Sequence, residues 1–222
     1  MTGVTLLRIS ARLAAITSAL VCVATTLAIA PSAAADPCPD IEVVFARGTN
    51  DTPGVGRVGQ AFTDALSAQI GGRSLTTYPV NYPASYDFLA AADGATDATN
   101  RISSMAAACP STRIVLGGYS QGAAVVDMLA GIPPLGNKIG EIGSAPPLPG
   151  SLVPNVGAVA VFGNPATKFS NPITSSVFGG RAIDLCKDGD PICSGGRNPF
   201  AHSDYVSAGL ADQAANFVAG II

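Results

Sequence analysis

One serine lies where its hydroxyl could become a nucleophile. Ser120 stands in 117-GGYSQGA-123, after an apolar run and before a run of small residues. A serine at a sharp turn from strand to helix has its hydroxyl exposed at the top of a sheet, and small neighbours let the strand and the helix approach closely. Gly118 and Gly122 occupy those neighbouring positions. The pattern predicts a nucleophile elbow, with the Gln121 backbone amide placed to donate to an oxyanion.

A serine hydroxyl needs a base to take its proton, and the usual base is histidine. The chain has one histidine, His202, which lies after the last predicted strand and before the terminal helix. This is the position of the base in α/β-hydrolases, where the chain order is serine, acid, histidine. If the chain uses a serine nucleophile, His202 must therefore be its base.

Five acidic residues between the serine and the histidine are candidates for the third group: Asp127, Glu141, Asp184, Asp188 and Asp190. Asp127 lies about two turns into the helix after Ser120, away from the sheet top. Asp184 falls inside a strand, and Glu141 falls in a long loop. The loop 186-CKDGDPIC-193 carries the remaining two, Asp188 and Asp190, and the residue pattern does not choose between them.

Four cysteines remain after the amino-terminal segment: Cys38, Cys109, Cys186 and Cys193. An even number of cysteines in an exported protein indicates two disulfides, and sequence alone permits three pairings. We favour the close pair Cys186 with Cys193, which leaves Cys38 with Cys109. The spacings match no common zinc pattern. A disulfide across the loop would restrict the position of its carboxylates.

The amino terminus predicts export. Arg8 and Arg12 precede an apolar run over 13–30, and 31-PSAAADPC-38 supplies an A-x-A cleavage site. We expect a signal peptide at residues 1–35 and a single domain at residues 36–222. An uncleaved anchor helix and a lipoprotein modified at Cys22 are the alternatives. The interpretation predicts a secreted protein and leaves open whether it stays at the cell envelope.

The net charge speaks against two classes of binding partner. Cleavage removes two arginines and no acidic residue, so the formal net charge falls from −3 to −5. A broad basic patch is therefore not expected, which speaks against nucleic acid or an anionic membrane surface as the main partner.

The elements that must position these residues alternate along the chain. Runs rich in β-branched residues predict buried strands, and they lie at 41–46, 76–82, 113–119, 156–163 and 181–186. Apolar or alanine-rich segments predict helices at 58–70, 89–108, 121–129 and 205–218. Segments 131–154 and 164–180 are rich in proline and glycine and predict loops. The order indicates a three-layer α/β sandwich around a mostly parallel five-stranded sheet.

Four segments together resemble the cutinase family of secreted serine esterases, and above all its mycobacterial members: 38-CPDIEVVFARGT-49, 117-GGYSQGA-123, 186-CKDGDPIC-193 and 201-AHSDY-205. The resemblance covers nearly all of residues 36–222. It implies Ser120 as nucleophile, His202 as base and Asp190 as the orienting acid, with an oxyanion hole at Thr49 and Gln121. It also implies the two disulfides favoured above, no metal or organic cofactor, and no large lid.

The resemblance defines the expected reaction more closely than the expected substrate. It implies hydrolysis of carboxylic esters of short to medium acyl chains through an acyl-enzyme, by a protein that we expect to be a monomer. Fungal members have serine where Thr49 stands, and loops 82–92 and 164–178 do not match their pattern. Acetyl esters of polysaccharides such as xylan and phospholipid or other lipid esters are alternative substrates. A secreted binding protein that keeps the fold without activity is the alternative that is not an enzyme.

Overall fold

The computed structural model describes Met1 and residues 38–135 and 142–222. The predicted signal peptide, apart from Met1, and Glu141 lie outside the described residues. The sheet has five parallel strands in the order β2-β1-β3-β4-β5. Their bounds are β1 Ile41–Ala46, β2 Leu75–Pro79, β3 Arg113–Tyr119, β4 Val156–Phe162 and β5 Ala182–Leu185. The predicted three-layer α/β fold is confirmed, and the sheet is parallel throughout.

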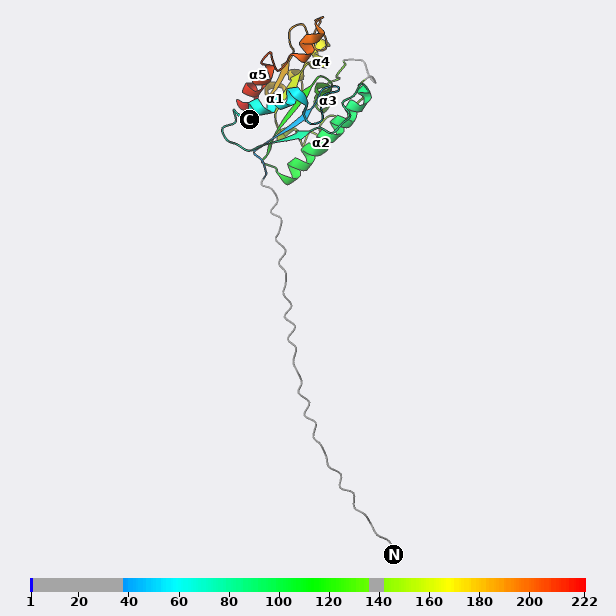
Figure 1. Cartoon of the computed structure of the whole chain (residues 1–222), viewed down its shortest axis with the longest axis vertical. Helices are drawn as coiled ribbons and strands as arrows, with labels where there is room; N and C mark the ends of the chain where they lie inside the picture. Colours follow the sequence, from blue (N-terminus) through cyan, green and yellow to red (C-terminus); the bar gives the residue numbers. More distant parts are fainter. Residues whose placement is uncertain (2–37, 136–141) are drawn as a thin grey trace. The chain divides into compact units, whose positions relative to one another are not determined.

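Residues 38–135 and 142–222 contain five α-helices: α1 Gly56–Ser67, α2 Ala91–Ala108, α3 Gln121–Leu129, α4 Pro165–Lys168 and α5 Leu210–Ala219. Helices α1 and α5 pack together on one face of the sheet, while α2 and α3 pack together on the other (Figure 1). Within residues 38–135 and 142–222, no helix has the length and hydropathy needed to span a bilayer.

The sheet is covered by helices on both faces, so the hydrophobic core has two parts. In β1, the side chains of Ile41, Val43 and Phe45 pack with α1 and α5, while Val44 and Ala46 pack with α2 and α3. Successive side chains of a strand point to opposite faces, so a strand covered on both sides is apolar at nearly every position. This is why the central strands appear in the sequence as mostly apolar runs, with the buried Glu42 of β1 paired to Arg101.

Several predicted elements differ from the structure in bounds or burial: β2 ends at Pro79 rather than at residue 82, and α1 spans Gly56–Ser67 rather than 58–70. Strand β2 is an edge strand whose Thr76, Thr77 and Pro79 are exposed, so it is not buried as predicted, and an edge is where a sheet tolerates proline. Segment 164–180 is not wholly loop, because the Asn164 side chain caps the short helix α4 by accepting from the Ala166 amide (2.9 Å).

The last helix begins five residues later than predicted. Gly209, just before α5, has a left-handed φ of 74°, which ends any helix running through it. Tyr205 therefore lies outside α5, in the segment that follows the 3₁₀ helix Pro199–Ser203.

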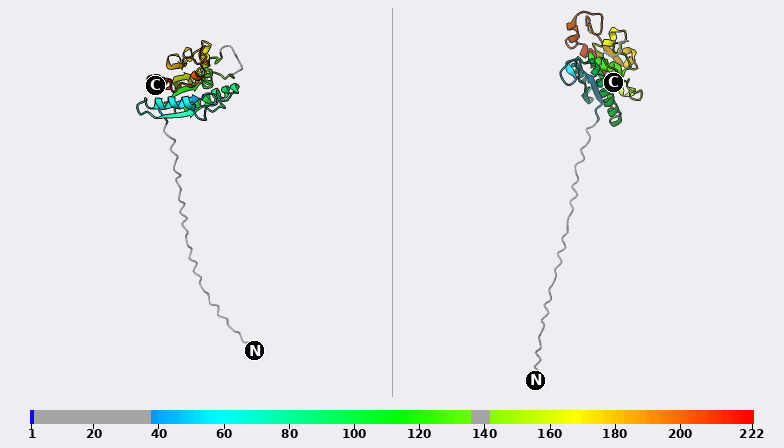
Figure 2. Two further views of the ribbon diagram at one scale, coloured as in Figure 1. Left: turned by 45° about the horizontal axis from the view of Figure 1, so that its top comes forward. Right: turned by 90° about the vertical axis from the view of Figure 1, so that its right-hand side faces the viewer.

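The topology gathers the predicted site at one edge of the sheet. After β1 the chain crosses to β2 on one side, whereas β3 lies on the other side of β1. Ligands of open α/β sheets bind at the carboxyl ends of the strands where the order reverses in this way. Thr49 follows β1 and Ser120 follows β3. Residues 186–205, orange in Figures 1 and 2, begin at the carboxyl end of β5.

The disulfide between Cys38 and Cys109 ties the segment before β1 to the end of α2. Its Cα atoms are 5.5 Å apart, and the two residues are separated by 71 positions in the chain. A bond that closes so long a loop restricts the unfolded chain strongly.

Candidate active site

The backbone turns sharply at Ser120, which has a φ of 56° and a ψ of −117°. A positive φ outside glycine is strained and persists where neighbouring contacts hold it. Here the Ser120 amide donates to the Phe162 carbonyl in β4 (2.8 Å). A Cβ on Gly118 would lie 2.2 Å from the Gly122 carbonyl oxygen, and one on Gly122 would lie 1.9 Å from that of Ala46. Only glycine fits at these two positions, so the turn has the close approach that the sequence predicted.

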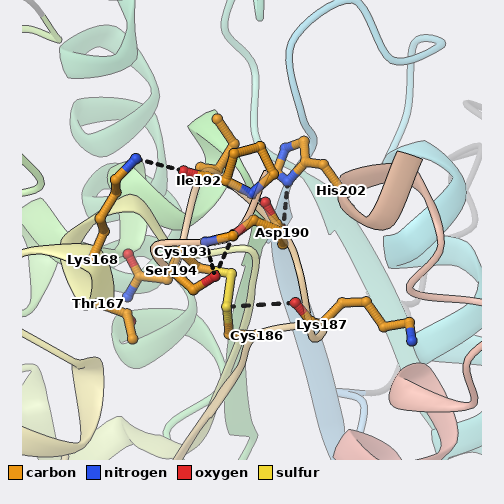
Figure 3. The surroundings of a disulfide bond; sticks show 12 residues. Thr167, Lys168, Cys186, Lys187, Asp190, Ile192, Cys193, Ser194 and His202 are labelled. Atoms are coloured by element: carbon orange, nitrogen blue, oxygen red, sulfur yellow. Dashed lines mark hydrogen bonds and ion pairs between the residues drawn. A yellow bond between two sulfur atoms is a disulfide. The ribbon is translucent and has the colours of Figure 1, made fainter. Parts of the chain in front are cut away.

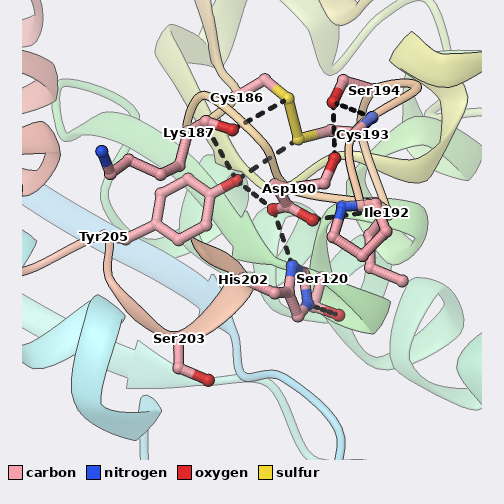
Figure 4. Close-up of polar contacts among 12 residues, drawn as sticks. Ser120, Cys186, Lys187, Asp190, Ile192, Cys193, Ser194, His202, Ser203 and Tyr205 are labelled. Carbon is pink, nitrogen blue, oxygen red and sulfur yellow. Dashed lines mark hydrogen bonds and ion pairs between the residues drawn. A yellow bond between two sulfur atoms is a disulfide. The ribbon is translucent and has the colours of Figure 1, made fainter. Parts of the chain in front are cut away.

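A single imidazole bridges the serine and an aspartate. His202 lies in the 3₁₀ helix Pro199–Ser203, and its Nε2 is 2.8 Å from Ser120 Oγ. Its Nδ1 is 2.7 Å from Asp190 Oδ2 (Figure 4). With Nδ1 protonated and donating to the carboxylate, Nε2 is free to accept the serine proton. The His202 side chain is 20% exposed and that of Asp190 is fully buried.

The Asp190 carboxylate has hydrogen-bond donors on both oxygens. Oδ1 accepts from the Ile192 amide (2.8 Å), and Oδ2 accepts from the Tyr205 hydroxyl (2.6 Å) as well as from His202. Burial raises the pKa of Asp190, but the hydrogen bonds from His202, Tyr205 and Ile192 outweigh it and hold the pKa below its usual value. The group is therefore a carboxylate at neutral pH.

The loop that carries Asp190 is closed by a disulfide. Cys186 and Cys193 are bonded with Cα atoms 5.8 Å apart, across a sequence separation of seven (Figure 3). Lys168 Nζ donates to the Pro191 carbonyl (2.7 Å) from outside the loop. These contacts fix the path of the loop and so the direction of its carboxylates.

The other acids lie away from the imidazole. Asp188 is exposed, and no hydrogen bond or ion pair joins its side chain to His202. Asp127 and Asp184 instead face Asn164, whose Nδ2 donates to both of them (3.1 and 3.0 Å). Burial raises the pKa of Asp127 well above its usual value, and nearby Asp184 raises it further. Of the candidates in the described residues, the structure brings Asp190 to His202.

Two tyrosines frame the imidazole, and the sequence predicted neither. The Tyr119 ring stacks on that of His202 with centroids 5.1 Å apart, and its hydroxyl donates to the His202 carbonyl. Burial raises the pKa of Tyr119 to about 12, so its hydroxyl remains a donor at neutral pH. The Tyr205 hydroxyl donates to Asp190, the partner of the imidazole. Below the ring, a Cβ on Gly163 would lie 2.9 Å from His202 Cε1.

The residues expected at the oxyanion hole are linked to each other. Thr49 Oγ1 donates to Gln121 Oε1 (3.2 Å), which joins the loop after β1 to the first residue of α3. That loop is held by Asp51, whose Oδ2 accepts from the Gly48 amide (3.0 Å), and by the Asn50 amide, which donates to the Ala84 carbonyl (2.7 Å). Gln121 opens α3, where backbone amides have no partner within the helix.

A cavity of about 690 Å³ opens at these residues. Its polar lining includes Thr49, Ser120, Gln121 and His202. Its apolar lining comes from Tyr86, Phe88, Leu135, Ile142 and Ile192. An apolar cavity with a few polar groups at one place suits a ligand with a hydrophobic body and one polar reacting centre.

Comparison with known proteins identifies the family. A family model described as Cutinase matches residues 37–222. The phospholipase Culp4 of Mycobacterium tuberculosis is 50% identical over 216 residues, which cover 95% of this chain and 92% of the relative.

Two solved structures are also similar to this chain. A Trichoderma reesei cutinase in complex with a C11Y4 phosphonate inhibitor matches with a TM-score of 0.67 at 36% identity, over 83% of this chain and 77% of that one. An acetylxylan esterase matches with a TM-score of 0.69 at 27% identity, over 83% of this chain and 99% of that one. The chain belongs to the cutinase family and is a serine esterase that hydrolyses carboxylic esters.

Proposed function

We propose that Ser120, His202 and Asp190 form the catalytic triad of this esterase. The observation that carries the proposal is the position of the His202 imidazole, which is within hydrogen-bond distance of Ser120 Oγ (2.8 Å) and Asp190 Oδ2 (2.7 Å) at once. A serine, a base and a group that orients the base are the parts that nucleophilic acyl transfer requires.

The reaction proceeds in two halves. His202 Nε2 takes the Ser120 proton as Oγ attacks the ester carbonyl, and the imidazolium then protonates the leaving alcohol. The acyl-enzyme that remains is attacked by water, which His202 deprotonates, and Ser120 is released with the acid product. In both halves the amides of Thr49 and Gln121 donate to the oxyanion, and Asp190 stabilises the imidazolium.

The preferred substrates are esters of short to medium acyl chains. The cavity offers apolar walls close to Ser120 but is open to solvent at residues such as Tyr86, which is 75% exposed. Such a site buries a short acyl chain but leaves most of a long acyl chain exposed to water, so lengthening the chain adds little binding.

Phospholipid is the second candidate substrate. Arg57 lines the same cavity as Ser120, and an exposed guanidinium there could face an anionic headgroup. The Mycobacterium tuberculosis relative named as a phospholipase supports the same alternative.

Hydrolysis of a series of p-nitrophenyl esters separates these possibilities. We expect the highest kcat/KM on butyrate or octanoate and a loss of activity to background in Ser120→Ala, because members of a triad fail together. Retained hydrolysis by Ser120→Ala would remove Ser120 from its role. A maximum on palmitate, or a preference for phosphatidylcholine or acetylated xylan, would overturn the proposed substrate class and leave the role of Ser120 unchanged.

We further propose that residues 1–35 are a signal peptide and that residues 36–222 act outside the cytoplasm as a monomer. The family match begins at residue 37, and two disulfides suit an oxidising compartment. The intact mass of protein recovered from the medium should correspond to an amino terminus at Asp36. Recovery of uncleaved chain from the membrane fraction would favour an anchor.

A further inference from the structure

A tyrosine shares the carboxylate oxygen that the imidazole uses. Tyr205 is fully buried, and its hydroxyl donates to Asp190 Oδ2 at 2.6 Å. His202 Nδ1 lies 2.7 Å from the same oxygen (Figure 4). Two donors therefore compete for the negative charge on one atom.

The direction of the tyrosine proton follows from its other neighbours. The Lys187 amide donates to the Tyr205 oxygen (3.2 Å), so that side of the hydroxyl is occupied by a donor. The disulfide sulfur of Cys193, at 3.4 Å, is a weak acceptor. The charged oxygen of Asp190 is the strong acceptor within reach, and the phenol proton must point to it.

Aromatic packing holds the phenol in place. The Tyr205 ring packs edge to face with Tyr119 (5.6 Å between centroids), Phe162 (6.2 Å) and His202 (6.3 Å). Tyr119 ends β3 and Phe162 ends β4, so the ring is fixed against the ends of two central strands. The hydroxyl is therefore a rigid support for the carboxylate.

We propose that Tyr205 is a positioning residue that orients Asp190 and limits how strongly this carboxylate attracts the His202 proton. The proposal rests on the triad proposed above. A carboxylate oxygen that accepts a second hydrogen bond is a weaker partner for the imidazolium, so the phenol sets both the geometry and the basicity of the pair.

The test replaces Tyr205 with phenylalanine, which keeps the ring and removes the hydroxyl. We expect kcat to fall about tenfold, because Asp190 loses one of the charge-assisted hydrogen bonds that hold it in the orientation His202 needs. The acid limb of the kcat/KM profile should move to higher pH, because the freed carboxylate stabilises the imidazolium more strongly. Asp51, Arg57 and Tyr119, the other titratable groups around His202, remain in place in this variant.

Tyr78→Phe is the matched control. Its hydroxyl also donates to an aspartate, Asp97 (3.1 and 3.2 Å), but between β2 and α2 rather than at the cavity. Removing it should leave kcat and the acid limb unchanged.

A second variant covers the case in which Tyr205→Phe does not fold. Ortho-fluorotyrosine at position 205 has a more acidic phenol that donates more strongly to Asp190, so the acid limb should move to lower pH. Where Tyr205→Phe also folds, the two variants should shift the acid limb in opposite directions, which a change in packing alone would not do.

The outcomes separate this inference from the function it rests on. An unchanged kcat and acid limb in folded Tyr205→Phe, or an unchanged acid limb with fluorotyrosine, would overturn the role of Tyr205 while leaving the triad intact. If the wild-type protein reacts with no fluorophosphonate and hydrolyses no ester, the triad and the role of Tyr205 are overturned together.

Discussion

Replacing Asp190 with asparagine removes the charge beside His202 and keeps the side chain nearly the same size. The carboxylate accepts at Oδ1 from the Ile192 amide and at Oδ2 from both His202 and Tyr205. An asparagine has one acceptor oxygen, so at least one of these donors must face its NH₂ group. If that group faces His202, it favours the tautomer with a proton on Nε2, which cannot accept from Ser120.

The size of the effect follows from the geometry. A carboxylate and an imidazolium with charge centres about 4 Å apart interact by about 4 kcal/mol at an effective dielectric constant of about 20. Each 1.36 kcal/mol is about tenfold in rate, so loss of the charge alone should lower kcat about 10³-fold. A partly wrong tautomer brings the expected loss to about 10⁴-fold.

The assay is steady-state hydrolysis of p-nitrophenyl butyrate, with Asp188→Asn as the matched control. Asp188 is two residues away in the same loop, but its side chain is exposed, and we expect its replacement to change kcat by less than about twofold. A larger loss in Asp188→Asn than in Asp190→Asn would transfer the role of the acid to Asp188. A folded Asp190→Asn with nearly full activity would refute the electrostatic reasoning itself.

Three further changes test other parts of the site. Gly163→Ala should lower kcat, because the added Cβ would lie 2.9 Å from Cε1 of His202 at a backbone φ of 58°; an unchanged kcat would show that the imidazole can move aside. Replacing Cys186 and Cys193 with serine should cost about 2 kcal/mol in the free energy of unfolding, from a loop separation of seven, and should also lower kcat. Urea unfolding and kinetics check this, and a stability loss with full kcat would mean that the loop keeps its path without the bond. Asp127→Asn should gain stability relative to the parent as pH rises above about 4. Burial raises the pKa of Asp127, so the folded parent keeps a proton that the unfolded chain releases, and its free energy of unfolding falls with pH; parallel pH profiles for the two proteins would argue against this.

The central strands and the sharp turn at Ser120 could be predicted because their signals are local. Mostly apolar runs predicted β1, β3 and β4, and two glycines around one serine predicted the turn at Ser120. His202 followed from being the only histidine. Edge strand β2 was harder, because exposure on the outer side of a sheet depends on which strand becomes its neighbour.

The surroundings of the imidazole could not be predicted in the same way. Asp188 and Asp190 are two residues apart in a loop without periodicity, so the residue pattern alone did not separate them. The resemblance to a family did, and in the structure the loop path turns Asp190 toward the imidazole. Tyr119 and Tyr205 lie in the segments that carry the resemblance, yet where their rings point depends on packing between residues distant in sequence.

Labelling of the purified protein by a fluorophosphonate tests the central claim most directly, because this reagent bonds only to an activated serine. Intact mass and peptide mapping should show one adduct, on Ser120, and none in His202→Ala. Absence of an adduct on folded protein with both disulfides formed, or an adduct on another serine, would contradict the proposed triad and favour a secreted binding protein without activity.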